Sequence, residues 1–169
     1  MRHTLDDAEA TRRKVVVGGN WRMSVSTQAE AVSLTTQIAE ELKAKDMKDV
    51  SVVIAPSMPH LSGVHQALNT ITEQAIRKRL RLAAQDVSPF APGAYTGDVS
   101  SEQLVDAGVS FIIIGHSDRR QMRNETNKIV NLKIERALND GFSVIVGIGE
   151  LLVDRETGQS EKALQTQIT

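Results

Sequence analysis

Five short apolar runs, most of them rich in β-branched residues, recur about every thirty residues along the chain. Runs of this length without polar alternation are typical of parallel strands that are buried on both faces. The third run is the weakest, because Arg81 interrupts it. The five runs are Val15–Gly19, Ser51–Ala55, Leu80–Ala84, Phe111–Gly115 and Val144–Ile148.

Helical patterns lie between these runs. Residues 27–43 open with Thr27 and Glu30 at the spacing of a capping box, and Ser100 and Gln103 repeat that spacing further along the chain. Apolar residues then follow at helical intervals. The pattern therefore predicts that a helix follows the first run and that another follows the third.

Three further segments are predicted to be helical. Ser57 can cap a helix that begins at Met58, followed by a proline that is well tolerated in a first turn. Residues 126–139 carry apolar side chains at helical spacing and stop before Gly141, which is typical of a helix terminus. Residues 158–168 could form a last helix.

Repeated strand–helix units indicate an α/β fold with right-handed crossovers. Two architectures satisfy the pattern: an open, doubly wound sheet, or the first five units of an eight-stranded barrel. Periodicity does not separate them, since both bury parallel strands. On the pattern alone, the length of 169 residues favours the open sheet, because a complete barrel needs about 250 residues.

Composition excludes several kinds of partner. The chain has 20 Lys and Arg against 21 Asp and Glu, a formal net charge of −1, whereas duplex binding needs a marked cationic excess. We therefore expect no nucleic-acid partner. The chain has no cysteine, and its four histidines include no metal-binding pair motif, so we expect no metal site. The apolar runs are too short to cross a bilayer, so we expect no membrane partner.

Residues 1–14 are rich in charged side chains and poor in apolar ones. We interpret them as a mobile tail that precedes one domain over residues 15–169. The tail lacks the apolar core of a secretory signal, and its acidic residues argue against an organelle transit peptide. The expected location is therefore the cytoplasm.

Polar side chains follow the strands at their carboxyl ends, where the chemistry of either architecture belongs. Asn20 and Arg22 follow the first strand, Gln85 the third and His116 the fourth. Taken singly, Asn20 could shape a turn, Arg22 could be a solvated charge and His116 could cap a helix or lie in the core. Their convergence on one rim favours a functional site. No glycine-rich nucleotide fingerprint is present, so nucleotide binding loses its main support.

Five sequence blocks stand in order at or just beyond these strand ends, and together they resemble triosephosphate isomerase over residues 18–150. The resemblance implies a partial TIM (β/α)8 barrel of about five parallel strands with outer helices. It also implies interconversion of dihydroxyacetone phosphate and glyceraldehyde 3-phosphate in glycolysis and gluconeogenesis, by proton transfer through an enediol and without cofactor or metal. The blocks are Gly19-Asn20-Trp21-Arg22-Met23, Ala83-Ala84-Gln85-Asp86-Val87, Gly93-Ala94-Tyr95-Thr96-Gly97-Asp98, Ile114-Gly115-His116-Ser117-Asp118-Arg119-Arg120 and Ile148-Gly149-Glu150.

The resemblance assigns roles to individual residues. His116 matches the neutral imidazole that polarises the substrate carbonyl, beside a helix start that disfavours the imidazolium. Asn20 matches the residue whose amide holds substrate oxygen atoms. Ser117 and Gln85 would support the surroundings of the site.

Two positions depart from the family pattern. Arg22 stands where the family has lysine, whose charge offsets the phosphate and the developing enediolate. Asp118 stands where the family has glutamate, so its carboxylate is shorter by one methylene. Arginine is a planar fork with a different reach from lysine. Both departures put catalytic activity in question, because a small displacement of a charged group in a tight active site lowers the reaction rate.

The resemblance also implies a homodimer. The segment Gly93–Asp98 resembles the loop that inserts into the partner subunit. Thr96 would then reach the region of the partner's Arg22, and Asp98 would pair with the partner's Arg119. The alternative is an ordinary surface turn bounded by glycines.

Extrapolating the strand spacing places a sixth strand at about residue 176, past Thr169. In the family, that strand carries the glutamate that removes the proton, and loops after strands seven and eight bind the phosphate. We therefore expect an incomplete chain that is inactive by itself, with its first and fifth strands as open edges. The alternatives are a pseudoenzyme or interaction module on the same fold, and a five-stranded phosphate-binding domain of another specificity.

Overall fold

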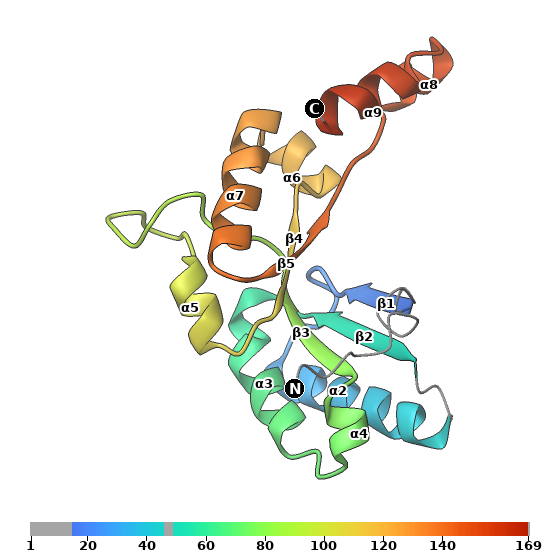
Figure 1. Cartoon of the computed structure of the whole chain (residues 1–169), viewed down its shortest axis with the longest axis vertical. Helices are drawn as coiled ribbons and strands as arrows, with labels where there is room; N and C mark the ends of the chain where they lie inside the picture. The colour runs from blue at the N-terminus through green and yellow to red at the C-terminus, as the bar shows by residue number, and fades with distance from the viewer. Residues whose placement is uncertain (1–14, 46–48, 169) are drawn as a thin grey trace, which may run out of the picture.

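A computed structural model describes residues 15–45 and 49–168, and within these ranges it contains one curled sheet of five parallel strands (Figure 1). Each strand pairs with the next one in the sequence. The predicted tail, residues 1–14, lies outside the described residues. The strands are β1 (Val15–Asn20), β2 (Val50–Ala55), β3 (Leu80–Ala84), β4 (Phe111–Ile114) and β5 (Ser143–Val146).

The order of the strands separates the two architectures that the sequence left open. A doubly wound sheet reverses its strand order at a switch point, whereas the strands of a barrel follow one another in sequence. Here all four pairings are parallel and sequential. The sheet is therefore part of a (β/α)8 barrel, and the preference for an open sheet that the chain length alone suggested was wrong.

The described helices are α2 (Gln28–Ala44), the short 3-10 helix η1 (Met58–His60), α3 (Leu61–Asn69), α4 (Gln74–Arg77), α5 (Ser101–Asp106), α6 (Ser117–Met122), α7 (Asn127–Asn139), α8 (Leu152–Glu156) and α9 (Ser160–Ile168). The helices lie outside the curled sheet, as Figure 1 shows for α2, α3 and α4 beside β1 to β3 and for α7 beside β4 and β5. Helix α2 packs against α3, and α7 packs against β4 and β5.

Both predicted capping boxes are confirmed. The backbone N–H of Glu30 donates to Oγ1 of Thr27 over 3.2 Å, while the Glu30 carboxylate accepts from the backbone N–H of Thr27 over 3.0 Å. Ser100 and Gln103 make the same reciprocal pair at the start of α5. These bonds satisfy backbone N–H groups that have no partner within the helix, and so they fix where each helix begins.

The expected cap at Ser57 is different in the structure. Its side chain makes no capping bond, because its Oγ contacts Nδ1 of His60 over 3.0 Å. The chain after Ser57 first forms the 3-10 turn η1 and then continues as α3 from Leu61. The helix start was correctly predicted, but the side chain of Ser57 does not cap it.

The three central strands are packed on both faces. Ile54, Leu82 and Ile112 pack toward the helices in the main core. Their neighbours in sequence, including Val53 and Ala83, form a smaller cluster on the other face. This alternation places helices outside and a second apolar layer inside, as in a barrel.

The outer strands are less buried than the sequence pattern suggested. Val15, Val16 and Val17 of β1 are each at least half exposed, and β5 has no fully buried residue. Full burial was therefore wrong for β1 and β5, because each has a sheet neighbour on one side only among the described residues. Within residues 15–45 and 49–168, β1 and β5 are the two outer strands of the sheet, as expected.

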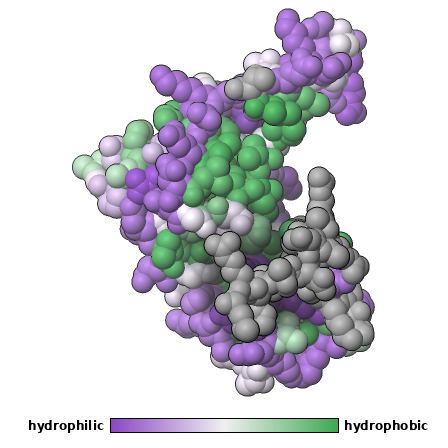
Figure 2. All heavy atoms as spheres, in the orientation of Figure 1, coloured by the Kyte–Doolittle hydropathy of each residue, from purple (hydrophilic) through white to green (hydrophobic). Residues whose placement is uncertain are grey.

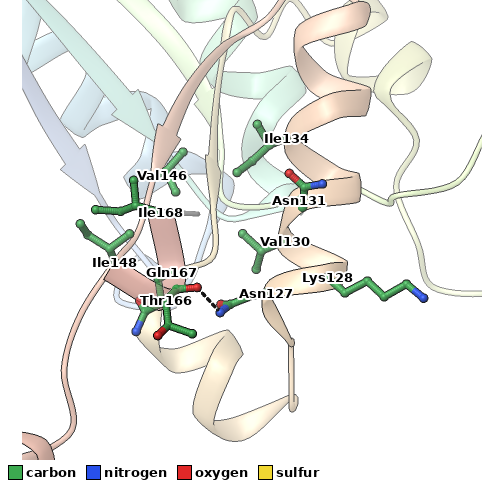
Figure 3. A pocket seen from close by; sticks show the side chains of 10 residues that line it. All are labelled: Asn127, Lys128, Val130, Asn131, Ile134, Val146, Ile148, Thr166, Gln167 and Ile168. Carbon is green, nitrogen blue, oxygen red and sulfur yellow. Dashed lines mark hydrogen bonds between the residues drawn. The ribbon is translucent and has the colours of Figure 1, made fainter. Parts of the chain in front are cut away.

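An apolar hollow lies beside β5. Figure 2 shows hydrophobic atoms gathered along the middle of the molecule and again under α8 and α9. A cavity of about 500 Å³ lies there. Figure 3 shows the side chains that line it, among them Val130 and Ile134 from α7, Val146 from β5, Ile148 after β5, and Ile168 at the end of α9. The C-terminal helix α9 thus shields only part of the exposed sheet edge.

Candidate active site

The predicted site residues lie at one end of the sheet because parallel strands present their carboxyl ends to the same rim. Asn20 is the last residue of β1, and Gln85 follows β3 directly. His116 stands two residues after the end of β4 and immediately before α6. The curl of the sheet brings Arg22, after β1, within contact distance of His116, although 94 positions separate them.

Arg22 has a left-handed backbone conformation, with φ of 50°. Non-glycine residues adopt this region at an energetic cost, so the surrounding structure must hold it. Oδ1 of Asn20 accepts from the backbone N–H of Arg22 over 3.1 Å, and Nε2 of Gln85 donates to its carbonyl over 3.0 Å. Gln85 also donates to the carbonyl of Ala55 over 3.0 Å. Asn20 and Gln85 therefore fix the backbone of Arg22 against the ends of three strands.

The side chain of Arg22 reaches across the rim. Its Nε donates to Oδ2 of Asp118 over 3.1 Å, and one terminal nitrogen lies 3.3 Å from Nε2 of His116. The side chains of Arg22 and Asp118 are 60% and 48% exposed, so water and a ligand can reach both. The two residues that depart from the family pattern are thus each other's partners.

The ring of His116 is fixed on its other side. Nδ1 accepts from the backbone N–H of Asp118 over 3.2 Å at the start of α6. A neutral imidazole accepts at one ring nitrogen only, and Nε2 also contacts a guanidinium nitrogen of Arg22, so the two contacts favour different tautomers. In the tautomer that accepts from Asp118, the proton lies on Nε2, and the ring and the guanidinium then present two donors whose nitrogens are 3.3 Å apart. Because two donors cannot bond each other, an acceptor oxygen placed between them would be bound by both.

The other predicted supporting residue, Ser117, is the first residue of α6. It is exposed and lines a cavity of about 510 Å³ with Arg120 and Gln121 from α6 and Gly149 and Glu150 after β5. This cavity adjoins the rim on the side of β5. Ser117 therefore lies next to the imidazole at the mouth of the site.

The predicted dimer loop is exposed. Thr96 lies at the surface, and Asp98 accepts a hydrogen bond from Oγ of Ser88 over 2.6 Å. Arg119 is already paired within its own chain, at 2.7 Å from both Asp86 and Glu125. A pair between Asp98 and the partner's Arg119 stays a prediction, and it would require Arg119 to share its donors.

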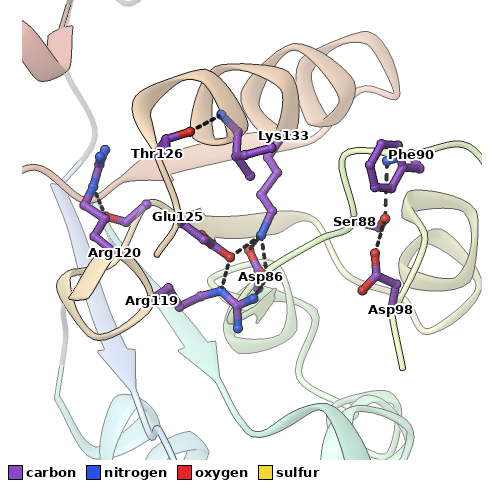
Figure 4. Close-up of polar contacts among 11 residues, drawn as sticks. Asp86, Ser88, Phe90, Asp98, Arg119, Arg120, Glu125, Thr126 and Lys133 are labelled. Carbon is purple, nitrogen blue, oxygen red and sulfur yellow. Dashed lines mark hydrogen bonds and ion pairs between the residues drawn. The ribbon is translucent and has the colours of Figure 1, made fainter. Parts of the chain in front are cut away.

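A cluster of four charges, three of them buried and the fourth, Arg119, partly exposed, lies beside this loop, and sequence reasoning missed it (Figure 4). Nζ of Lys133 donates to both carboxylate oxygens of Asp86, over 2.8 and 2.7 Å, and to Glu125 over 2.6 Å. Arg119 completes the cluster. The Lys133 side chain is only 5% exposed. One signal could have found it: Lys133 falls on the buried stripe of α7 between Val130 and Ala137.

Burial and pairing act against each other on the two carboxyls of this cluster. Burial raises the pKa of Glu125, but the hydrogen bonds and charges of Lys133 and Arg119 lower it further than burial raises it, so that its pKa lies below the usual 4.5. At Asp86, burial raises the pKa more than Lys133 and Arg119 lower it. With all four groups ionised, the charges of the cluster cancel.

No group of three or more metal-ligating side chains that could hold an ion occurs in residues 15–45 and 49–168. Within the same ranges, no helix is long and apolar enough to cross a membrane.

Comparison of the sequence with known proteins shows which family the chain belongs to. The family model for triosephosphate isomerase matches residues 15–169, which is nearly the whole chain. The chain belongs to the triosephosphate isomerase family. The triosephosphate isomerase of Prosthecochloris aestuarii is 41% identical over 156 residues, which cover 92% of this chain and 58% of the relative.

Other triosephosphate isomerases match over a similar extent. The protein from a Psychrobacter species is 40% identical over 154 residues, covering 89% of this chain and 56% of the relative. That from Chlorobaculum tepidum is 41% identical over 150 residues, covering 89% and 58%. The chain thus spans a little under three-fifths of the length of these triosephosphate isomerases.

Proposed function

We propose that residues 15–169 supply one part of a triosephosphate isomerase site, which interconverts dihydroxyacetone phosphate and glyceraldehyde 3-phosphate. The observation that carries this proposal is the contact between His116 and Arg22 on the rim. Nε2 of His116 and a terminal nitrogen of Arg22 lie 3.3 Å apart, and with the proton on Nε2 both would be donors. An oxygen that becomes negatively charged in an enediolate is the kind of ligand that such preorganised donors stabilise.

The reaction moves a proton between two adjacent carbons of the triose. His116 would donate its Nε2 proton to the substrate carbonyl oxygen, which becomes a hydroxyl, and would then accept the proton of the enediol hydroxyl on the adjacent carbon as that oxygen becomes the new carbonyl. With Nδ1 accepting from the backbone N–H of Asp118, the ring would carry its proton on Nε2, on the substrate side. Arg22 would offset the charge of the phosphate and of the enediolate.

Asn20 would hold a substrate oxygen through its amide nitrogen. Its Oδ1 is engaged by the backbone of Arg22, and among the described residues its Nδ2 donates to no partner. The family resemblance implies that the proton-abstracting glutamate comes from a sixth strand. We therefore propose that the 169-residue chain by itself has no measurable turnover.

The family resemblance supports a homodimer as the working form, with the Gly93–Asp98 loop reaching the partner subunit. Phe90 and Tyr95 stack at this loop with ring centroids 4.5 Å apart, which stiffens its base. We expect the enzyme to act in the cytoplasm, as the sequence predicts.

A coupled assay tests the proposal. The 169-residue chain is assayed alone and as a chimera, joined at its carboxyl end to the last three strand–helix units of the Prosthecochloris aestuarii relative. We expect no turnover from the chain alone and clear turnover from the chimera. A folded, soluble chimera without turnover would contradict the proposal and favour a non-catalytic role. Turnover by the chain alone would refute its proposed inactivity.

A further inference from the structure

The ends of β4 and β5 approach each other closely at two glycines. Gly115 has a φ of +73°, and the backbone N–H of Gly147 donates to the carbonyl of Ile114 over 2.7 Å. A Cβ on Gly147 would lie 2.8 Å from the carbonyl oxygen of Gly115 and 3.0 Å from Cα of His116. The turn that carries His116 therefore rests directly on the end of the neighbouring strand.

One side chain bridges this junction. Nε of Arg120 donates to the carbonyl of Gly115 over 2.7 Å, and one of its terminal nitrogens donates to the carbonyl of Gly147 over 3.3 Å. The other terminal nitrogen donates to Oδ1 of Asn127 over 2.6 Å, at the first turn of α7. Asn127 in turn donates to the carbonyl of Thr166 in α9 over 2.9 Å.

The partners of Arg120 are unusual for an arginine. All three acceptors are uncharged, whereas its neighbour Arg119 binds two carboxylates on the other side of α6 (Figure 4). Burial lowers the pKa of Arg120, against a smaller raising effect of Glu125. The planar fork of a guanidinium can reach three acceptors in fixed directions, which the single nitrogen of lysine does not reproduce.

We propose that Arg120 is a positioning residue for His116. By holding the carbonyl of Gly115 in its left-handed turn and tying it to the end of β5, Arg120 fixes the backbone from which the imidazole projects. The ring then keeps Nδ1 on the N–H of Asp118 and Nε2 toward Arg22. The role of His116 in catalysis rests on the proposed function, but the orientation of its ring does not.

Nitrogen-15 NMR of the histidine rings in the 169-residue chain tests this orientation without substrate. Ring nitrogen shifts report which nitrogen carries the proton. In the unmodified chain we expect one predominant tautomer of His116, with the proton on Nε2. In Arg120→Gln we expect shifted and broadened His116 signals from mixed tautomers. His60 and His65, bonded to Ser57 and Asn69, serve as internal controls that should not change.

Two further variants sharpen the comparison. Arg123→Gln removes an exposed arginine just beyond the same helix and should leave all ring signals unchanged. Arg120→Lys keeps the charge but loses the fork, so it should resemble Arg120→Gln at His116. If Arg120→Gln does not fold, Arg120→Lys carries the test.

The proposal is overturned if a folded Arg120 variant retains the His116 signals of the unmodified chain. It is also overturned if the signals of all three described histidines move together, because Arg120 would then stabilise the fold in general. In the chimera, Arg120→Gln should lower kcat by ~10- to 100-fold and change KM less, as expected for a small displacement of a catalytic group. Because the NMR readout needs no turnover, failure of the proposed function leaves this test intact.

Discussion

Nε of Arg22 lies 3.1 Å from Oδ2 of Asp118, although the two residues are 96 positions apart. Each departs from the residue that the family resemblance implies at its position, and the departures are complementary. The longer arginine meets the shorter aspartate, and the carboxylate holds the cation beside the imidazole. The sequence alone shows two separate departures, whereas the structure shows that the two residues make one contact across the rim.

This pair should stabilise the fold only slightly, because both side chains are well exposed to solvent. A double-mutant cycle with Arg22→Ala, Asp118→Ala and the double variant measures their coupling in urea unfolding. We expect a coupling energy of about 0.2–1 kcal/mol, the range of exposed ion pairs. A coupling of about 3 kcal/mol or more would show that the pair is a structural element of the fold.

Replacing Lys133 by methionine should destabilise the chain strongly. The variant leaves Asp86 and Glu125 to share the one cation of Arg119 in a buried cluster. Removing one partner from a buried ion pair typically costs about 3–5 kcal/mol. Urea unfolding measures this loss. Lys128→Met, at an exposed position of the same helix, is the matched control and should change stability by less than about 0.5 kcal/mol. Equal effects of the two variants would refute the importance of the cluster.

The contribution of Glu125 to stability should depend on pH. Its pKa lies below 4.5 in the folded chain, so the ionised carboxyl stabilises the fold above the unfolded pKa, and this gain is lost as pH falls through the folded value. Glu125→Gln should therefore be less stable than the unmodified chain at about pH 7, and the difference should shrink toward about pH 3. Unfolding in urea across this range measures it. Glu135→Gln, at an exposed position of α7, should show no such trend.

Gly108 should not tolerate a side chain. Its φ is +75°, and a Cβ there would lie 2.0 Å from Nδ1 of His65. Left-handed backbone costs a residue with a Cβ about 1–2 kcal/mol, and displacement of the imidazole adds to this. Thermal unfolding of Gly108→Ala should show a lower midpoint. Gly18→Ala, with nothing within 4 Å of the added carbon, should leave the midpoint nearly unchanged. An unchanged Gly108→Ala variant would contradict the described turn.

Local sequence patterns predicted the elements well where one physical signal dominates. The apolar runs locate every described strand to within a residue or two. In the three central strands the cause is burial in a parallel sheet, which demands apolar side chains on both faces. The capping spacing of Thr27 and Glu30 fixes the start of α2. The position of His116 at a strand end predicts its place on the rim, since parallel strands end together.

Other features depend on contacts that no local pattern encodes. Helices α4, α6 and α8 have four to six residues each, too few to show a helical period. The cluster around Lys133 joins residues from three separate segments, so only the tertiary fold brings them together. The bridge made by Arg120 depends likewise on how closely β4 and β5 end beside each other. In the sequence, Arg119 and Arg120 are adjacent and alike, yet they have opposite surroundings.

We propose that the imidazole of His116 acts on the substrate from this rim. The most direct test is kcat/KM for glyceraldehyde 3-phosphate in the chimera that carries the missing strand–helix units, with and without His116→Gln. Because a positioned acid–base group contributes roughly 100- to 10,000-fold, we predict a loss of at least ~100-fold in a variant that folds normally. A folded His116→Gln chimera within about twofold of the unmodified one would contradict the account.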